Sequence, residues 1–493
     1  MVRAQDSYPL RHGAQARRTG ACRFKSPPGA SGLQRLSEME AFFHFWLYFK
    51  EMMPNHTQNP PESFIKKLGF LGPGFILSAS IVGSGELIAT TILGAKGGFI
   101  TFWVILVSCL IKVSVQLEFG KNAIVSGKPL MQEFGDLSGL GLTKSNWAVW
   151  STFVLTLFKI LQLGGMLGGA AIVLNLIVPQ VSMVVWIVFL GLSLGLLIFK
   201  NYYHLIEKAS MLMVFGFTLF TIASLIGLFF TPFAFSTADV LSGLTFDLPQ
   251  EVLFVAIGAF GITGVASDEI IAYSYWCQEK GYATFTGSND GSEEWKKRAQ
   301  GWIKIMYMDA FLAMTIYTLV TAAFYLLGAA ILHGQDSLPD GMDLINSLAA
   351  IYTESLGAGA KYGYLIGAFF ALYSSVFATL AYWSRLFPDI FSQLGWITSN
   401  DGKGQEKWVK ILAWALPIIW ILTFLFVQLP GFMILSGGVV GSVLLLVVVF
   451  AGIKFRAKNR KLQLVSGWWS EIIFWLSVAS ILTVSGYGIF KLF

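Results

Sequence analysis

The stretch that decides the fold spans residues 72–99 and reads GPGFILSASIVGSGELIATTILGAKGGF. It is long and apolar enough to cross a membrane, which takes about twenty residues, yet its middle holds glycines and a carboxylate. A helix in lipid disfavours both, because unpaired backbone groups and charges are costly there. We therefore expect the helix to break at Gly83, Ser84 and Gly85, with Glu86 beside the break.

A second stretch of this kind lies five apolar runs later, at residues 258–269 (GAFGITGVASDE). Gly258, Gly261 and Gly264 are expected to break that helix. Broken helices at matching places of two halves are typical of transporters, because unwound backbone is tolerated only where it lines a cavity. Close helix packing would explain the glycines but not the acidic residues. The residues expected to line the site here are Ala266, Ser267, Asp268 and Glu269.

The composition is that of a membrane protein. Of 493 residues, 55% are hydrophobic and 13% charged, and the mean hydropathy is +0.65, whereas soluble domains carry about a quarter charged residues. These values predict an all-α polytopic membrane protein with about eleven spans. The apolar runs lie at 68–93, 100–124, 147–178, 181–199, 206–231, 250–276, 304–332, 361–387, 408–428, 430–453 and 468–490.

The spans divide the chain into four predicted parts. Residues 63–231 and 232–455 form two five-helix repeats, and residues 456–493 add one further transmembrane helix. Residues 1–62 are polar and Arg-rich with one short aromatic run, so we expect a cytoplasmic tail or a start-site artefact, with the working protein starting near Met52 or Met53.

Charge in the connectors predicts the orientation. Basic residues gather in every second connector, within residues 121–144, 200–208, 296–298, 403–410 and 454–461. Two of the remaining connectors are acidic and contain Asp239, Asp247, Glu251, Asp336, Asp340 and Asp343. Because positive residues stay inside, we expect a multi-pass protein of the inner (plasma) membrane, with its N-terminus cytoplasmic and its C-terminus outside.

Several function classes are disfavoured by the sequence. The net charge of +6 comes from these short connectors, which argues against nucleic acid as a partner. The three cysteines have no metal-site or disulfide spacing. No Walker A, HExxH or GxSxG sequence occurs, so neither an ATP-driven pump nor a membrane hydrolase is indicated, and no cofactor is expected.

Three stretches resemble the Nramp family of divalent-metal transporters: residues 72–99, QLEFGKNAIVSG at 116–127, and GAFFALYSSVFATLAYWSRLFPDIF at 367–391. The resemblance implies the five-plus-five inverted-repeat (LeuT-like) fold of the amino-acid/polyamine/organocation superfamily, with a site between broken spans one and six. The family's Asp-Pro-Gly-Asn is replaced by residues 83–86, and its Met-Pro-His by residues 266–268. The chain looks most like a bacterial side branch that carries GSGE.

These replacements change the expected ligands. Without the family's methionine, the groups at hand are carboxylate, hydroxyl and carbonyl oxygens, which suit Mg²⁺ or Mn²⁺. Glu86, Asp268 and Glu269 would balance the ion, and Ser84 and Ser267 would help complete its shell. Adjacent residues on a helix point about a hundred degrees apart, so we expect Glu269 to line the site and Asp268 to form a salt bridge or carry a proton.

Five further charges lie within spans and are candidates for ion pairs or for coupling: Lys112, Glu118, Lys159, Asp309 and Arg385. For each of them an ion pair is the better interpretation. Lys159 would repel a bound metal or hold Glu86 or Glu269 when the site is empty, and it would also suit an anionic or zwitterionic substrate.

The resulting hypothesis is a secondary active transporter of divalent metal cations, coupled to a gradient of H⁺ or Na⁺, whose partners are the transported ion and the lipid bilayer. The alternative is a carrier of organic solutes such as amino acids, with the substrate carboxylate at half-helix N-termini. A membrane sensor that does not transport is the third interpretation.

Overall fold

The computed structural model describes residues 57–83, 85–139, 141–142, 145–200, 203–334, 342–397, 402–464 and 467–492. The predictions for residues 1–56, for Ser84 and for the acidic residues Asp336 and Asp340 lie outside this part of the chain. Of the predicted tail, residues 57–62 are described. There Gln58 donates its backbone N–H to the carbonyl of Phe285 at 2.8 Å, so this short segment is bound to the helical body.

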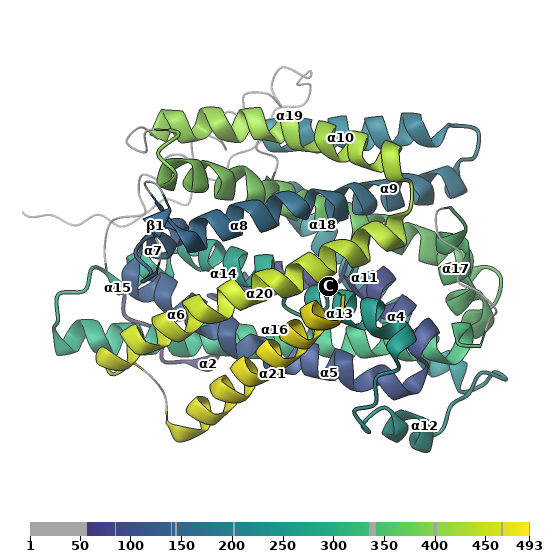
Figure 1. Cartoon of the computed structure of the whole chain (residues 1–493), viewed down its shortest axis with the longest axis horizontal. Coiled ribbons are helices and arrows are strands. Elements are labelled where there is room, and N and C mark those ends of the chain that lie inside the picture. The colour runs from purple at the N-terminus through teal and green to yellow at the C-terminus, as the bar shows by residue number, and fades with distance from the viewer. Residues whose placement is uncertain are drawn as a thin grey trace, which may run out of the picture. The chain divides into compact units, whose positions relative to one another are not determined.

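The described residues are almost entirely helical, which confirms the predicted all-α class (Figure 1). Strands β1 (Gly141–Leu142) and β2 (Ser145–Asn146) pair antiparallel, with Gly141 opposite Asn146. The first half of the chain contains α2 (Phe64–Leu68), α3 (Pro73–Ile81), η1 (Gly85–Thr90), α4 (Thr91–Gly97), η2 (Phe99–Thr101), α5 (Phe102–Ile111), α6 (Val113–Ser126), α7 (Leu130–Gly135), α8 (Trp147–Phe158), α9 (Ile160–Ile177), α10 (Met183–Phe199) and α11 (Tyr203–Leu228).

The second half repeats the pattern of long helices joined by short connectors. It contains α12 (Thr237–Ser242), η3 (Gln250–Val252), α13 (Leu253–Ile262), α14 (Ser267–Glu279), α15 (Tyr282–Thr286), α16 (Glu293–Leu332), α17 (Met342–Leu356), α18 (Ala360–Gln393), α19 (Gly402–Val427), α20 (Pro430–Lys461) and α21 (Trp468–Leu492). Eight of the described helical segments are long and apolar enough to span a membrane, and Met183–Phe199 and Leu212–Leu228 are shorter apolar helices. Ten of the eleven predicted apolar runs overlap these helices, and the first run, 68–93, is divided among α2, α3, η1 and α4.

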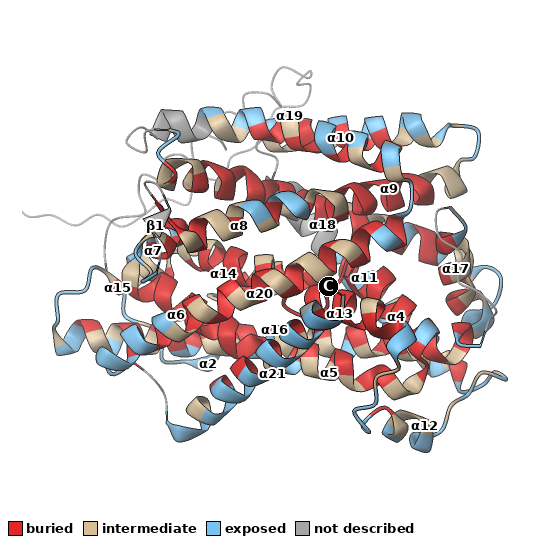
Figure 2. Ribbon diagram, in the orientation of Figure 1, coloured by how far each residue is buried: buried red, intermediate tan, exposed pale blue. Residues whose placement is uncertain are grey.

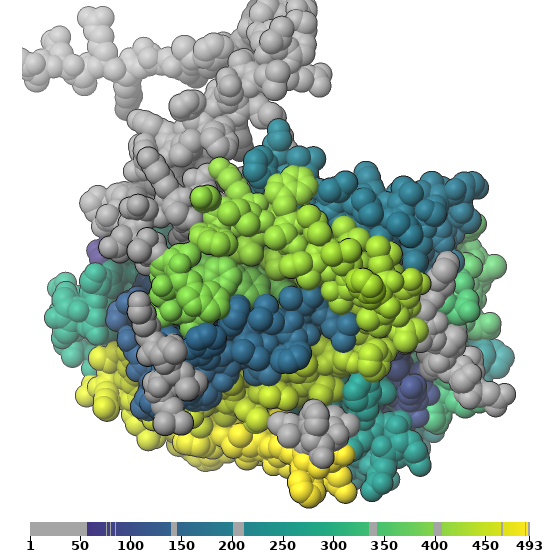
Figure 3. Space-filling view, turned by 45° about the horizontal axis from the view of Figure 1, so that its top comes forward, coloured from purple at the N-terminus to yellow at the C-terminus, as the bar shows by residue number. Residues whose placement is uncertain are grey.

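The burial pattern separates a buried centre from an exposed outer surface (Figure 2). Helices α13, α9 and much of α20 are buried, whereas α10, α19 and α21 expose large apolar side chains such as Phe189, Ile418 and Trp475. In the space-filling view α10 and α19 lie next to each other on one face (Figure 3). An apolar exterior around a satisfied helical backbone is what a bilayer requires.

Glycines let α13 and α20 cross closely near the middle of the bundle (Figure 1). A Cβ on Gly261 would lie 1.8 Å from the carbonyl oxygen of Gly438, and a Cβ on Gly438 would lie 2.1 Å from that of Gly258. Gly258 and Gly261 therefore sit inside α13 and permit packing. The expectation that they break the helix is corrected.

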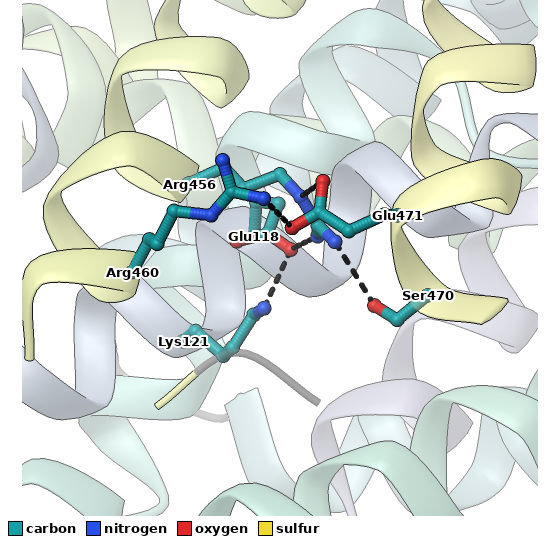
Figure 4. Close-up of polar contacts among 6 residues, drawn as sticks. All are labelled: Glu118, Lys121, Arg456, Arg460, Ser470 and Glu471. Atoms are coloured by element: carbon teal, nitrogen blue, oxygen red, sulfur yellow. Dashed lines mark hydrogen bonds and ion pairs between the residues drawn. The ribbon is translucent and has the colours of Figure 1, made fainter. Parts of the chain in front are cut away.

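Glu118 belongs to an ion cluster that joins α6 to α20 and α21 (Figure 4). One of its carboxylate oxygens accepts hydrogen bonds from Lys121 and Arg456. Arg456 also donates to Glu471 at 3.2 Å and to Ser470 at 3.2 Å. Since each buried charge here has an opposite partner, Glu118 forms the predicted structural ion pair, which ties the additional C-terminal helix to the first repeat.

Candidate functional site

The first predicted break is present in span one. Helix α3 ends at Ile81, and the chain resumes as the π-helix η1 at Gly85. At Gly83 the backbone lies against α18, where a Cβ would come within 1.9 Å of the Ser375 hydroxyl oxygen. That hydroxyl hydrogen-bonds the Ser80 carbonyl at 3.1 Å. Only glycine fits here, so the sequence signal at Gly83 reflects a close helix contact at the break.

The second break separates α13 from α14. Thr263 is extended, with φ −78° and ψ 153°, and Gly264 follows with φ +60°. A Cβ on Gly264 would also lie 2.9 Å from the backbone of Cys109. Of the three glycines expected to interrupt this span, Gly264 is therefore the one that lies in the break, where its left-handed conformation is needed.

Glu86 connects the two breaks. Its side chain is fully buried, and one carboxylate oxygen accepts hydrogen bonds from Gly264 N–H at 3.1 Å and from the Thr321 hydroxyl at 3.2 Å. The other oxygen makes no hydrogen bond to a protein group. Glu86 is not among the residues lining the cavity described next. The expectation that Glu86 and Glu269 face one cavity together is thus not met by this geometry.

A cavity lies beside the breaks, between α3, α9, α14 and α18. The cavity is small: the centre of a water-sized molecule can occupy about 40 Å³ of it. Asp268 and Glu269 are the charged residues among those that line it, and much of the remaining wall is apolar. Its polar lining residues are Ser80, Gln162, Asp268, Glu269, Ser375, Thr379 and Tyr382.

Both adjacent carboxylates reach the cavity because they occupy the first turn of α14, directly after the break. Glu269 caps this helix by accepting a hydrogen bond from Ala266 N–H at 2.6 Å. Asp268 forms a salt bridge with Lys159. The predicted ion pair of Asp268 is present, but Asp268 lines the cavity together with Glu269. Ala266 also lines it, whereas the buried Ser267 does not.

Lys159 occupies the turn where α8 passes into α9. Its side chain is 1% exposed and its ammonium group contacts Asp268. The prediction that Lys159 pairs with a carboxylate of the site is confirmed. Its partner, however, is Asp268 and neither Glu86 nor Glu269. A cation that approaches Asp268 must compete with this ammonium group.

Lys112 also lies at a helix interruption, between α5 and α6. Its ammonium group donates to the backbone carbonyls of Phe260 and Thr263, each at 2.7 Å, at the end of α13. Ser108 hydrogen-bonds the same two carbonyls, at 3.1 and 2.9 Å. The partners of Lys112 are thus main-chain dipoles at the second break, which a search for carboxylates in the sequence does not find.

The two remaining predicted charges lie farther from the breaks. Asp309 on α16 accepts hydrogen bonds from the backbone N–H groups of Gly72, at 2.9 Å, and Gly74. It therefore caps the N-terminus of α3, where a negative charge is favourable. Arg385 forms a salt bridge with Glu279 at 3.0 Å. Both residues have structural partners, and neither lines the cavity.

Gln162, Met166 and Tyr382 are among the cavity residues that the sequence analysis did not identify. The Gln162 side-chain oxygen and the Tyr382 hydroxyl are buried and make no hydrogen bond to a protein group. Gln162 and Met166 follow Lys159 by three and seven residues, so all three share one helix face. That spacing from a buried lysine is the signal that could have identified them.

The charged ligands at the cavity are few. Within the described ranges, no three His, Cys, Asp or Glu side chains converge as a metal cluster would. A metal ion at Asp268 and Glu269 would complete its coordination with neutral oxygens, the Met166 thioether or water.

Comparison with known proteins gives consistent results. A family model described as natural resistance-associated macrophage protein-like matches residues 74–491. The chain is 23% identical over 362 residues to the protein PM0681 of Pasteurella multocida, covering 69% of this chain and 74% of that protein.

Solved structures share the fold. A variant of the manganese transporter of Eremococcus coleocola aligns with a TM-score of 0.64 at 15% identity, covering 87% of this chain and 88% of that one. MhsT in complex with L-phenylalanine aligns with a TM-score of 0.53 at 15% identity, covering 88% and 100%. Both likenesses support the predicted LeuT-like architecture.

Proposed function

The chain belongs to the family of natural resistance-associated macrophage protein-like membrane transporters, and from this premise we propose that it carries divalent metal cations across the plasma membrane. The observation that carries the proposal is the pair of carboxylates, Asp268 and Glu269, that lines the cavity at the second break. Two negative charges next to a helix start suit a divalent cation as counter-ion.

The chemistry of the cavity favours Mg²⁺, with Mn²⁺ as the second candidate. Mg²⁺ gives up its water reluctantly and is commonly held by one or two carboxylates while keeping several waters. The buried oxygens of Gln162 and Tyr382 can accept hydrogen bonds from such metal-bound waters. The Met166 thioether in the wall is the feature that also suits the softer Mn²⁺.

Lys159 gives the site a way to exchange charges. With Lys159 protonated, the group of Asp268, Glu269 and Lys159 carries one net negative charge. A divalent ion that binds Asp268 displaces the lysine, because both cations compete for one carboxylate. When the metal leaves, the lysine returns to Asp268, and the group again carries a single net negative charge. This exchange keeps an unoccupied carboxylate pair tolerable inside a membrane.

We further propose that the cavity faces the cytoplasm. If the N-terminus is inside, as the loop charges predict, then α3, α14 and the end of α18 form the inner halves of their spans. Most of the residues that line the cavity lie on α3, α14 and α18. On the opposite side α4 packs tightly against α16, where a Cβ on Gly94 would lie 2.5 Å from the Tyr325 carbonyl oxygen. A gradient of H⁺ or Na⁺ would drive alternation between the two sides.

Isothermal titration of Mg²⁺ and Mn²⁺ into purified protein tests the proposal. Glu269→Gln and Asp268→Asn should each lower metal affinity by roughly tenfold or more, because half of the balancing charge is removed in a poorly solvated site. Glu86→Gln is the matched control: it neutralises another buried carboxylate at a break, but one outside the cavity, so metal affinity should change much less. Unchanged binding in both cavity variants would overturn the proposal.

The same titration examines the alternative of an organic-solute carrier. The apolar wall, with Trp276 and Tyr382, and the cationic Lys159 are features that a zwitterionic amino acid would also use. Amino-acid binding by wild-type protein that binds neither metal would establish that alternative. Metal binding without amino-acid binding would exclude it.

A further inference from the structure

At the second break, two charged side chains bind the backbone donor and the backbone acceptor that would pair with each other in a continuous helix. In a continuous α-helix, the N–H of Gly264 would donate to the carbonyl of Phe260, four residues earlier. Here Gly264 N–H donates to Glu86 instead, at 3.1 Å. The Phe260 carbonyl accepts from Lys112 Nζ at 2.7 Å. Each side chain thus satisfies a backbone group that the break leaves unpaired.

The ammonium group of Lys112 is bound in the way that a metal cation is bound at a helix end. It is fully buried, contacts two carbonyl oxygens at the C-terminal end of α13, and lies 5.1 Å from the centre of the Phe260 ring. The ion pairs found in the described part of the chain do not include it. Its charge is therefore balanced mainly by carbonyl dipoles at the C-terminal end of α13 and by nearby Glu86.

In transporters with broken helices, carbonyls of this kind are where coupling cations such as Na⁺ are coordinated. We propose that Lys112 is a tethered cation that occupies this place permanently, so that no diffusible monovalent cation binds at the end of α13. Lys112 is not a cavity residue, and substrate binding leaves its contacts in place. With respect to transport, this inference rests on the function proposed above and predicts a transporter that does not require Na⁺.

The first test uses wild-type protein. Its melting temperature, and Mg²⁺ uptake into proteoliposomes, should be the same in Na⁺, K⁺ and choline salts of equal ionic strength. A saturable rise of either quantity with Na⁺ would overturn the proposal, because a free Na⁺ site would then exist despite the lysine.

The second test replaces the cation. Lys112→Ala leaves the two carbonyls without a cation and leaves space beside them, so its melting temperature should fall and should be restored saturably by methylammonium or Na⁺. Lys112→Met fills the same space with an uncharged chain, so methylammonium should not restore it. Ser108→Ala removes a hydroxyl from the same carbonyls without removing charge, and it should show no response to either cation.

Absence of any cation response in folded Lys112→Ala would contradict the proposal, since a purely structural lysine would give that result. If Lys112→Ala cannot be obtained folded, the wild-type comparison decides. The melting measurements need no transport activity. If wild-type protein moved neither Mg²⁺ nor Mn²⁺, the proposed function would fail while the tethered cation would still be tested.

Discussion

The two broken helices occupy equivalent places in the two halves of the fold, but they are held by different forces. At the first break the contacts are small and uncharged: Gly83 lies against Ser375, and Ser375 hydrogen-bonds the Ser80 carbonyl. At the second break charged side chains hydrogen-bond the backbone of both helices. Lys112 donates to a carbonyl at the end of α13, and Glu269 accepts from an N–H at the start of α14.

This difference indicates that the two halves of the fold have different structural roles. Close packing and one hydroxyl hydrogen bond hold the first break against α18, so its sequence requires small residues more than charges. The second break carries the carboxylates of the cavity, and its backbone is satisfied by side chains from other helices. The two halves therefore differ in their charges: both carboxylates of the cavity lie on α14, whereas Glu86 on η1 accepts a hydrogen bond at the second break and does not line the cavity.

The largest expected effect concerns the packing beneath the second break. Gly261→Ala would place a methyl group 1.8 Å from a backbone carbonyl oxygen of α20. Backbone cannot move aside without separating the two helices, so we expect a loss of about 3 kcal/mol or more and little folded protein. Fluorescence-detected size-exclusion chromatography and melting temperature measure this. Gly216→Ala, with no atom within 4 Å of the added carbon, is the control and should behave as wild type.

Gly83→Ala tests the same contrast at the first break. Its added carbon would lie 1.9 Å from the Ser375 hydroxyl oxygen, which belongs to a side chain. The defect should therefore be relieved by the second substitution Ser375→Gly. No substitution of a side chain can relieve Gly261→Ala in this way, because its obstacle is main chain. A double variant as damaged as Gly83→Ala would show that the first break is not seated by this contact.

A smaller effect is expected from the charge at the cavity. Lys159→Met removes the cation that competes for Asp268, and two like charges 4 Å apart repel by about 4 kcal/mol at an effective dielectric of 20. Since the lysine of the wild type can partly withdraw from the metal, we expect Mg²⁺ affinity to rise by roughly tenfold in the variant. The metal-free variant should melt at a lower temperature, because Asp268 is then an unpaired carboxylate. Titration calorimetry and melting curves with and without Mg²⁺ measure both. Weaker binding would mean that Lys159 positions Asp268 for the metal.

The sequence predicted the features that depend on the free-energy cost of placing a particular residue within an apolar segment. Glycines and carboxylates inside an apolar run are expensive in lipid, so the breaks near Gly83 and Gly264 were predictable, as were the spans. The partners of the buried charges were not. Lys112 binds backbone carbonyls, and Glu86 binds a backbone amide of the other repeat. Such contacts depend on tertiary packing and leave no spacing pattern in one sequence.

The cavity wall was the least predictable part. Met166 and Gln162 lie on a helix whose buried face is otherwise apolar and glycine-rich, so in the sequence only their spacing from Lys159 distinguishes them from packing residues. Gly258 and Gly261 were wrongly predicted to break the helix, because a glycine that permits packing and a glycine that ends a helix look the same in sequence. Only the position of α20 distinguishes them.

The smallest effect is expected for a carboxylate that caps a helix in water instead of at a break. Asp239 on α12 accepts hydrogen bonds from the backbone N–H and the hydroxyl of Ser236, both at 2.7 Å. These bonds hold the pKa of Asp239 below its ordinary value. The stabilisation of α12 is therefore complete above the pKa of an unfolded Asp, about 3.9, and is lost as the pH falls through the lower pKa of the folded state.

Asp239→Asn mimics the protonated side chain at every pH, so its comparison with wild type isolates the charge. At pH 7, hydrogen–deuterium exchange of peptides covering residues 236–245 should be faster in the variant by a small factor, with metal affinity unchanged, because the residue is exposed and outside the cavity. The difference should close as the pH falls below the unfolded value of about 3.9 and through the lower folded-state pKa, where wild-type Asp239 also becomes neutral. If the ratio of the exchange rates of variant and wild type stayed constant with pH, Asp239 would act through its shape and not through its charge. The comparison of a charge at the buried break with a charge at the exposed cap would then be contradicted.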